Sequence, residues 1–144
     1  MTEAEQKALC AQIMEDSVAP VQFSTMVGLA FDRLDQTGAE GHFVATKELC
    51  NPFGIVHGGV YYTLMDQLAG MAACSSGRGA VTLDANVSYL RAARVGDVVR
   101  CRLSAVHLGS TVVVYRGECR GEDETLFCTG EFHLFLKNPL EEML

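Results

Sequence analysis

The sequence predicts an α+β fold in which an antiparallel sheet wraps around one long central helix, with an extra helix at the N-terminus. Two observations carry this prediction. Strand-like segments are grouped before and after a single long helical segment instead of alternating with helices, which favours an antiparallel sheet. The long helical segment is also largely apolar on both sides, so we expect it to be buried nearly all round.

The segment ahead of the central helix is expected to form one helix and two strands. Residues 2–16, TEAEQKALCAQIMED, begin with Thr2 and a Glu-rich first turn and carry apolar side chains on one side, which predicts a helix that Pro20 closes. Strand-like patterns follow at residues 25–35 and 42–48, with TGAEG between them as a hairpin turn. An irregular stretch then leads to the central helix.

The central helix is expected to begin at His57 or Gly58 and to run to about Ser75. One side is a stripe of large apolar residues that faces a core: Val60, Leu64, Leu68 and Met71. The other side holds small residues around one acid: Gly59, Thr63, Asp66, Gly70 and Ala73. Asp66 is the only charged residue in this helix. An ionised carboxylate removed from water is costly unless it is paired. We therefore expect Asp66 either to be held by a partner group or to take part in the function of the protein.

Four strand-like runs follow the helix with no helix between them. Gly or polar turn residues join the runs at hairpin length, which predicts an antiparallel meander over residues 81–90, 97–107, 111–120 and 125–136. Period-two alternation places Thr82 on one strand face with Asp84, Asn86 and Ser88, a face that is unusually polar for a central strand.

Composition and length narrow the functional classes. A net charge of −7 argues against a nucleic-acid surface, because phosphate binding relies on clustered Lys and Arg. Six cysteines without C-x-x-C spacing and a polar N-terminus predict reduced thiols in a cytoplasmic protein, and no apolar run is long enough to span a membrane. We expect one domain over residues 1–144, with residues 1–20 as a helical appendage.

The segment HGGVYYTLMDQLAGMAA resembles the hotdog-fold thioesterases of the phenylacetate-pathway and acyl-CoA thioesterase 13-like family. That family has an Asn a few residues ahead of H-G-G, a helix that starts at the glycines, and an acid nine residues after the His. Asn51, His57, Gly58 and Asp66 stand at those spacings. The later run TLDANVSYLR, followed by V-G-D, is also similar and places Thr82 at the family's Ser or Thr position.

The resemblance covers roughly residues 25–137 and implies a hotdog fold that hydrolyses an acyl-CoA thioester. It further implies a site shared between two subunits of a homodimer, which often pairs into a homotetramer. The acid would come from one subunit, as general base or nucleophile. The helix N-terminus at Gly58, which polarises the thioester carbonyl, would come from the other.

The residues themselves fit this chemistry, although each also has a structural explanation. A helix that begins at Gly58 offers unpaired backbone N–H groups to a developing oxyanion. His57 could equally be a capping residue in a tight turn, and Asn51 could orient water or form an Asx turn. Thr82 could hydrogen-bond Asp66 or the water, or be an ordinary strand residue.

Candidates for contacts with coenzyme A are fewer. They are Gly59, Tyr89, Arg91, Ser110 and Thr111, with Arg94 and Lys137 as further cations. No basic residue stands near Ser110 in the sequence. Residues that could line an acyl pocket, or simply be core, are Phe53, Tyr61, Tyr62 and Met65.

No metal or cofactor is expected, because His42, His107 and His133 lie on separate predicted strands without zinc-site spacing. Two alternative functions stay open. One is a non-catalytic acyl-CoA-binding or assembly domain with a structural Asp66. The other is a hotdog hydratase or dehydratase that acts on acyl thioesters.

Overall fold

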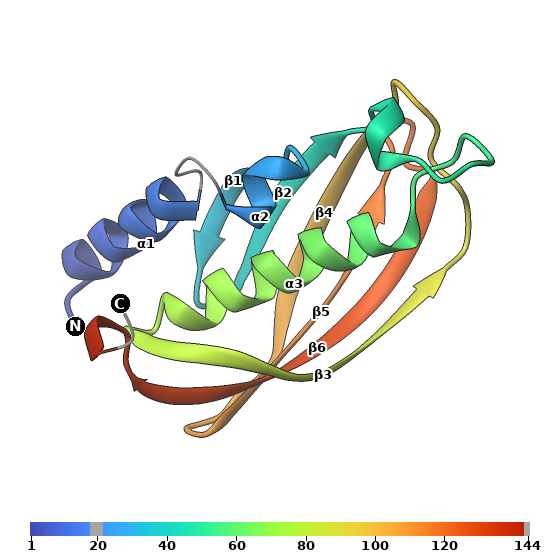
Figure 1. The fold of residues 1–144 in the computed structure, drawn as a ribbon. Helices are drawn as coiled ribbons and strands as arrows, with labels where there is room; N and C mark the ends of the chain where they lie inside the picture. Colours follow the sequence, from blue (N-terminus) through green and yellow to red (C-terminus); the bar gives the residue numbers. More distant parts are fainter. Residues whose placement is uncertain (18–21, 143–144) are drawn as a thin grey trace.

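In the computed structural model of this protein, a six-stranded antiparallel sheet curves around one long helix, α3 (Figure 1). The structure describes residues 1–17 and 22–142, so the expected helix stop at Pro20 lies outside the described residues. The helices are α1 (Glu3–Ser17), α2 (Phe23–Met26) and α3 (Gly58–Cys74), with 3-10 turns η1 (Lys47–Leu49) and η2 (Leu140–Glu142). The strands are β1 (Ala30–Asp35), β2 (Gly38–Val44), β3 (Arg78–Tyr89), β4 (Val98–Leu108), β5 (Val112–Arg120) and β6 (Leu126–Pro139).

The strand order in the sheet is β1-β2-β4-β5-β6-β3, which corrects the predicted meander. Of the four strands after α3, β4, β5 and β6 are neighbours in chain order, while β3 pairs with β6 and forms an edge of the sheet. The connection at residues 90–97 is therefore a crossover and not a hairpin. Backbone hydrogen bonds hold it against the loop ahead of α3, from Val56 N to the Ala93 oxygen at 2.9 Å and from Ala45 N to the Asp97 oxygen at 2.8 Å.

The first predicted strand was too long, because its first part is the short helix α2. Thr25 Oγ1 accepts a hydrogen bond from Gln22 N at 3.2 Å and donates one to the Gln22 oxygen at 2.9 Å, which closes a helical turn. Gly28 then takes a φ of 71°, a left-handed conformation that ends the helix.

The expected TGAEG turn is also displaced. Asp35 Oδ1 accepts from Thr37 N at 2.7 Å, so the hairpin closes at residues 36–37 and β2 already begins at Gly38. A Cβ at Gly41 would lie 2.7 Å from the Ala30 oxygen on the neighbouring strand. The glycines that suggested a turn therefore allow close strand contact.

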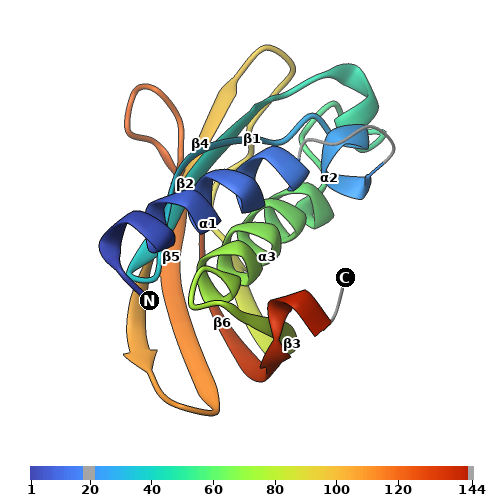
Figure 2. The same cartoon turned by 90° about the vertical axis from the view of Figure 1, so that its left-hand side faces the viewer.

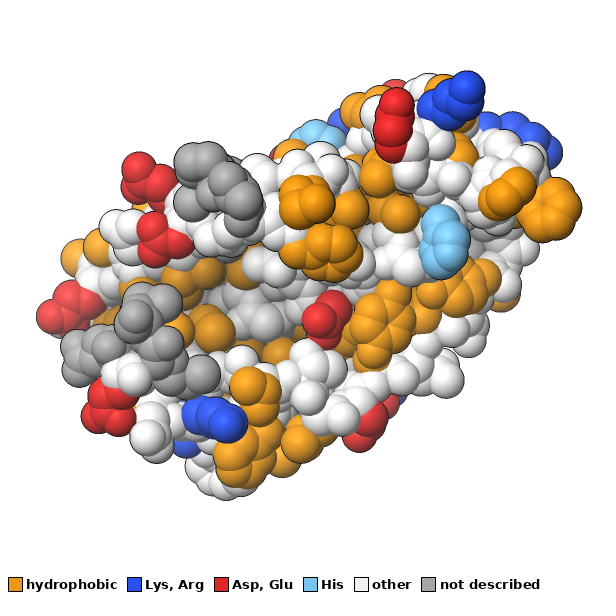
Figure 3. All heavy atoms as spheres, viewed as in Figure 1, with side chains coloured by type: hydrophobic (Ala, Val, Ile, Leu, Met, Phe, Trp, Pro, Cys, Tyr) orange, Lys and Arg blue, Asp and Glu red, His pale blue; other side chains and the backbone are white. Residues whose placement is uncertain are grey.

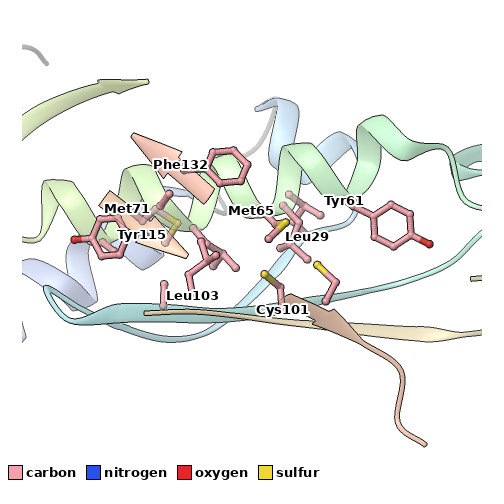
Figure 4. Packing of buried hydrophobic residues seen from close by; sticks show 14 of the residues in the cluster. Leu29, Tyr61, Met65, Met71, Cys101, Leu103, Tyr115 and Phe132 are labelled. Carbon is pink, nitrogen blue, oxygen red and sulfur yellow. The ribbon is translucent and has the colours of Figure 1, made fainter. Parts of the chain in front are cut away.

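The core lies between α3 and the concave face of the sheet (Figure 4). Leu64, Met65 and Leu68 of α3 are fully buried there, which confirms the predicted apolar stripe. The opposite side of α3 is open in the single chain, since Gly59 is exposed and Asp66 and Gly70 are only half-buried. The expectation that α3 is buried nearly all round is thus wrong for one chain. Ala73, expected on the open side, belongs to the core.

Helix α1 forms as predicted and packs beside α3 and β1 (Figure 2). Its first turn is closed by reciprocal bonds, from Thr2 N to Glu5 Oε2 at 2.6 Å and from Glu5 N to Thr2 Oγ1 at 3.2 Å. The turn η2 lies at the same end of the molecule, where Leu140 N donates to the Gly77 oxygen at 3.0 Å. No helix among the described residues is long and apolar enough to cross a membrane.

Candidate active site

The acid of α3 is held by a hydroxyl from β3. Thr82 Oγ1 donates a 2.7 Å hydrogen bond to Asp66 Oδ1, so the predicted contact between these residues is confirmed. Asp66 is half-buried on the open side of α3, and no described residue donates to its second oxygen, Oδ2. One carboxylate oxygen is therefore fixed in place and the other is available to a water or a substrate.

A β-bulge at Leu83 turns Thr82 toward α3. In the pairing of β3 with β6, Thr82 lies opposite Leu134, which is buried, and Asp84 lies opposite His133 on the outer face. Leu83 is the extra residue between them. The expectation that Thr82 shares a strand face with Asp84, Asn86 and Ser88 is therefore wrong.

The start of α3 is capped by its own histidine. His57 Nδ1 accepts a 2.9 Å hydrogen bond from Gly59 N, and Val60 N donates to the His57 oxygen at 3.0 Å. The capping interpretation of His57 is thus confirmed, and a neutral ring carries its proton on Nε2. The Gly58 N–H has no acceptor among the described residues and remains the available donor at the positive end of the helix.

Tyr89 fixes the first turn of α3 from the other end of β3. Its hydroxyl donates a 2.8 Å hydrogen bond to the Gly58 oxygen. A Cβ at Gly58 would lie 3.0 Å from Cζ of the Tyr89 ring, so glycine is what lets the two elements approach. Partial burial raises the pKa of Tyr89, which keeps its phenol protonated as a donor near neutral pH.

Five of the predicted residues share one cavity of about 340 Å³, here called the Gly58 cavity. Its lining includes Gly58, Asn51, Tyr61, Tyr89 and Arg91. Asn51 Oδ1 accepts from Phe53 N at 3.0 Å, which confirms the Asx turn. The Arg91 side chain is exposed and has no ion pair or hydrogen bond with any described residue, so its charge is available.

A second cavity, of about 350 Å³, lies beside Asp66 and Thr82 and is here called the Asp66 cavity. Asp66 follows Gly58 by eight residues, or about 12 Å at about 1.5 Å per helical residue. A single chain therefore keeps the available Gly58 N–H away from the carboxylate. Figure 3 shows this side of the molecule, where the surface over α3 is hollowed between α1 and β3.

Ser110 and Thr111 line neither cavity and lie at the turn between β4 and β5. The guanidinium of Arg78 holds this turn to the end of β6, donating to the Ser110 oxygen at 2.5 Å and to the Lys137 oxygen at 2.8 Å. Arg78 is thus a basic residue beside this turn in the structure, although it lies far from Ser110 in the sequence. Reasoning from the sequence missed Arg78 because the contact depends on β3 lying beside β6.

Neither a metal ion nor a thiol nucleophile is indicated. Among the residues described here, no group of three His, Cys, Asp or Glu is arranged to hold a metal ion. Burial raises the pKa of Cys74, whose side chain lines the Asp66 cavity, so this thiol stays protonated near neutral pH.

Known proteins that are similar to this chain in sequence or in structure include thioesterases. Residues 53–128, more than half of the chain, match the Thioesterase superfamily profile. A 1,4-dihydroxy-2-naphthoyl-CoA thioesterase 2 from Arabidopsis thaliana is 29% identical over 92 residues, which cover 62% of this chain and 59% of that protein.

Two solved structures show the same fold. The E. coli PaaI protein from the phenylacetic acid degradation operon has a TM-score of 0.85 and 19% identity, covering 92% of this chain and 96% of that chain. A thioesterase protein from Streptococcus pneumoniae, solved with coenzyme A, has a TM-score of 0.74 and 21% identity, covering 96% and 98%. These likenesses confirm the predicted hotdog fold.

Proposed function

The chain belongs to the thioesterase superfamily, and from this membership we propose that it hydrolyses an acyl-CoA thioester to coenzyme A and a carboxylic acid. The observation that carries the proposal is the hydrogen bond from Thr82 to Asp66 on the open side of α3. A carboxylate with one oxygen held and the other free, beside a cavity, is suited to act on a water or on a thioester carbon.

Asp66 has two chemically distinct roles in this proposal. As a general base, it takes a proton from the water that attacks the thioester carbonyl. As a nucleophile, it forms an acyl-enzyme anhydride that water then hydrolyses. A single turnover in ¹⁸O-labelled water tests this: a base places the label in the product acid, whereas an anhydride that water opens at the Asp66 carboxyl carbon leaves an unlabelled Asp66 oxygen there. Trapping with hydroxylamine detects an anhydride that water would open at the acyl carbon, which also labels the product.

The oxyanion donor in this proposal is Gly58 of a second chain. The N–H of Gly58 is unpaired at the positive end of α3, where a developing negative charge is stabilised. Because about 12 Å of helix separates Gly58 from Asp66 in one chain, the complete site needs two.

Strand β3 offers the surface for that pairing. It forms an edge of the sheet, and its Val81 and Leu83 are 38% and 53% exposed. An antiparallel pair of β3 strands with a two-fold axis beside Ala85 and Asn86 would set Thr82 opposite Tyr89 of the partner subunit, since both are equally far from the axis. Each Asp66 cavity then meets the Gly58 cavity of the other chain, which gives a homodimer with two sites.

For the coenzyme A part of the substrate, the proposal relies on Arg91. Its unpaired guanidinium is exposed at the Gly58 cavity and suits a phosphate group, while Tyr89 and the exposed Gly59 border the same helix start. Ser110 and Thr111 lie in neither cavity, so the phosphates are assigned to Arg91 ahead of them. Asn51 lines the Gly58 cavity and is placed to contact the thioester or water.

The test is a thiol-release assay on a panel of acyl-CoAs with wild type, Asp66→Asn and a matched control, Asp123→Asn. Asp123 is the same residue type, exposed in the turn between β5 and β6, and it lines neither cavity. We expect wild type and Asp123→Asn to release free thiol, and Asp66→Asn to be folded by circular dichroism but at least about 100-fold slower.

The other results are equally informative. Binding of acyl-CoA without release of thiol by the wild type supports the non-catalytic alternative. Conversion of an unsaturated acyl-CoA without thiol release supports the hydratase alternative. Equal activity of Asp66→Asn and wild type would remove Asp66 from the mechanism.

A further inference from the structure

The Asp66 cavity is built from parts of the chain that lie far apart in the sequence. Asp66 and Thr82 stand at one end of it. Its apolar wall comes from α1, α3, β3, β6 and η2 and includes Ile13, Gly70, Cys74, Ala80, Leu134 and Leu140. Because the carboxylate lies at the rim of an apolar space, a thioester held at Asp66 would have its acyl group inside the cavity.

The lining of this cavity combines small or aliphatic residues with five polar ones, Asp16, Gln22, Asp66, Gln67 and Thr82. None of its described lining residues is aromatic, and none is Lys or Arg. Its charged lining residues are Asp16 and Asp66, so an acyl group with its own terminal carboxylate would meet only negative charge. The cavity therefore suits an uncharged aliphatic chain and not coenzyme A phosphates or a dicarboxylic acyl group.

The aromatic candidates for an acyl pocket lie elsewhere. Met65 is 0% exposed and lies in the core (Figure 4), and Tyr61, which is 2% exposed, lines the Gly58 cavity and not the Asp66 cavity. Phe53 is 84% exposed in the loop ahead of α3, and Tyr62 packs against Phe132. The expectation that these residues line the pocket is not supported by the Asp66 cavity.

The cavity extends along α3. Asp66, Gly70 and Cys74 succeed one another at intervals of four residues, so the wall that they form is about 12 Å long at about 1.5 Å per residue. A fully extended polypeptide backbone advances about 3.6 Å per residue, and each residue contributes three backbone bonds. An extended carbon chain therefore advances about 1.2 Å per bond. About ten bonds therefore fit between the carboxylate and the far end at Cys74.

We propose that the acyl group is an unbranched aliphatic chain of about eight to ten carbons, which lies along α3 from Asp66 toward Cys74 and ends against Ile13 of α1 and Leu140 of η2. This inference rests on the proposed thioesterase function and adds the substrate class. Helix α1 and the C-terminal turn η2 form the end wall and limit the chain length.

Gly70 is the residue that keeps the middle of the cavity open. A Cβ added at Gly70 would meet no atom within 4 Å, so a larger side chain there enters the cavity without displacing the fold. Leucine also favours the helix more than glycine does. Gly70→Leu is therefore expected to fold and to fill the space about one helical turn from Asp66.

The test compares the chain-length profiles of wild type, Gly70→Leu and a control, Ala11→Leu, with straight-chain acyl-CoAs of about four to sixteen carbons and with benzoyl-CoA. Ala11 is exposed on α1 and does not line the cavity. In the wild type, kcat/KM should rise by up to about fourfold per methylene and level off at about ten carbons. Gly70→Leu should lower kcat/KM for the ten-carbon substrate by at least about 30-fold and for the four-carbon substrate by less than about threefold.

Three outcomes overturn the proposal while leaving the thioesterase function intact: an equal loss at all chain lengths in Gly70→Leu, a wild-type preference for benzoyl-CoA, or a rise that continues to sixteen carbons. A binding measurement covers the case in which no acyl-CoA is cleaved. Non-hydrolysable S-alkyl-CoA thioethers should bind wild type more tightly with each methylene up to about ten carbons and should lose that trend in Gly70→Leu. A flat trend in wild type contradicts the proposed pocket whether or not hydrolysis occurs.

Discussion

Thr82 and Tyr89 face the same helix, although they are an odd number of positions, seven, apart on one strand. Thr82 donates to Asp66 and Tyr89 donates to the first residue of α3, Gly58. In a regular strand an odd separation puts two side chains on opposite faces. The extra residue at the Leu83 bulge brings both side chains to the same face of β3. One hydroxyl therefore reaches Gly58 at the start of α3, and the other reaches Asp66 in the middle of the helix.

The rate of hydrolysis should depend on the hydroxyl group of Thr82 and not on the shape of its side chain. Thr82→Val keeps the side-chain volume but removes the donor to Asp66, and hydrogen bonds to charged groups contribute about 1.5–3 kcal/mol. We expect kcat/KM to fall about 10- to 100-fold in Thr82→Val and less than about threefold in Thr82→Ser. Steady-state kinetics on folded variants checks this, and equal rates for the two variants would contradict it.

The phenol of Tyr89 should support the start of α3. Tyr89→Phe keeps the ring against Gly58 and removes a neutral hydrogen bond of about 0.5–1.5 kcal/mol. We expect kcat/KM to fall about three- to tenfold. Tyr62→Phe is the matched control, because Tyr62 lies on α3 outside both cavities. A loss as large in the control as in Tyr89→Phe would show that the Gly58 contact is not the cause.

His57 should stabilise the fold as an N-cap. His57→Ala removes the acceptor for Gly59 N and should lower the free energy of unfolding by about 1 kcal/mol, whereas His57→Asn supplies another capping oxygen and should stay within about 0.5 kcal/mol of wild type. Urea unfolding at one fixed protein concentration measures both. If His57→Asn recovers stability but not activity, His57 has a role in the reaction beyond capping.

An ion network on the outer sheet face should make stability depend on pH. His133 lies between Glu131 and Asp84, at 2.9 and 2.8 Å, and hydrogen bonding to Glu131 is the main reason that its pKa is raised above the ordinary 6.5. The charged ring thus favours the folded state. This stabilisation is fully present below about pH 6.5 and is lost as pH rises through the raised folded-state pKa.

The partner carboxylate behaves in the opposite sense. The bonds from His133 and Arg116 lower the pKa of Glu131 below its ordinary 4.5, so its contribution is present above about pH 4.5 and lost as pH falls through the lowered value. The urea midpoint of His133→Gln should therefore lie below that of wild type at about pH 5.5 and match it at about pH 9. Because the network is exposed, added salt should shrink the difference at the lower pH. A difference independent of pH would rule out the ionic cause.

The sequence was most informative where the pattern is local. The start of α3 at Gly58, one of the two starts expected, follows from motif and spacing, and the structure confirms it. The hydrogen bond of Thr82 with Asp66 was one of the alternatives left open after the family resemblance, and it is the one that the structure shows. The four strands after α3 also form near the predicted bounds, because each has a β-branched or aromatic run between turn residues.

Pairing and register could not be predicted in the same way. The position of β3 beside β6 depends on contacts between segments that lie far apart in the chain, and no local residue pattern marks the extra residue Leu83. The same non-local pairing brings Arg78 to the turn at Ser110. The helix α2 had a local signal, Gly28, which was compatible with either a turn or a strand end.

The distance between the two cavities of one chain has a consequence for how activity responds to the amount of protein. With a site completed only by pairing, the rate grows with the square of chain concentration when most chains are alone and becomes linear once they are paired. In the proposed dimer, chains made at a level below the dissociation constant of the pair would have almost no activity. The separation of Gly58 and Asp66 along α3 would then make activity depend on a threshold level of expression, without any additional ligand.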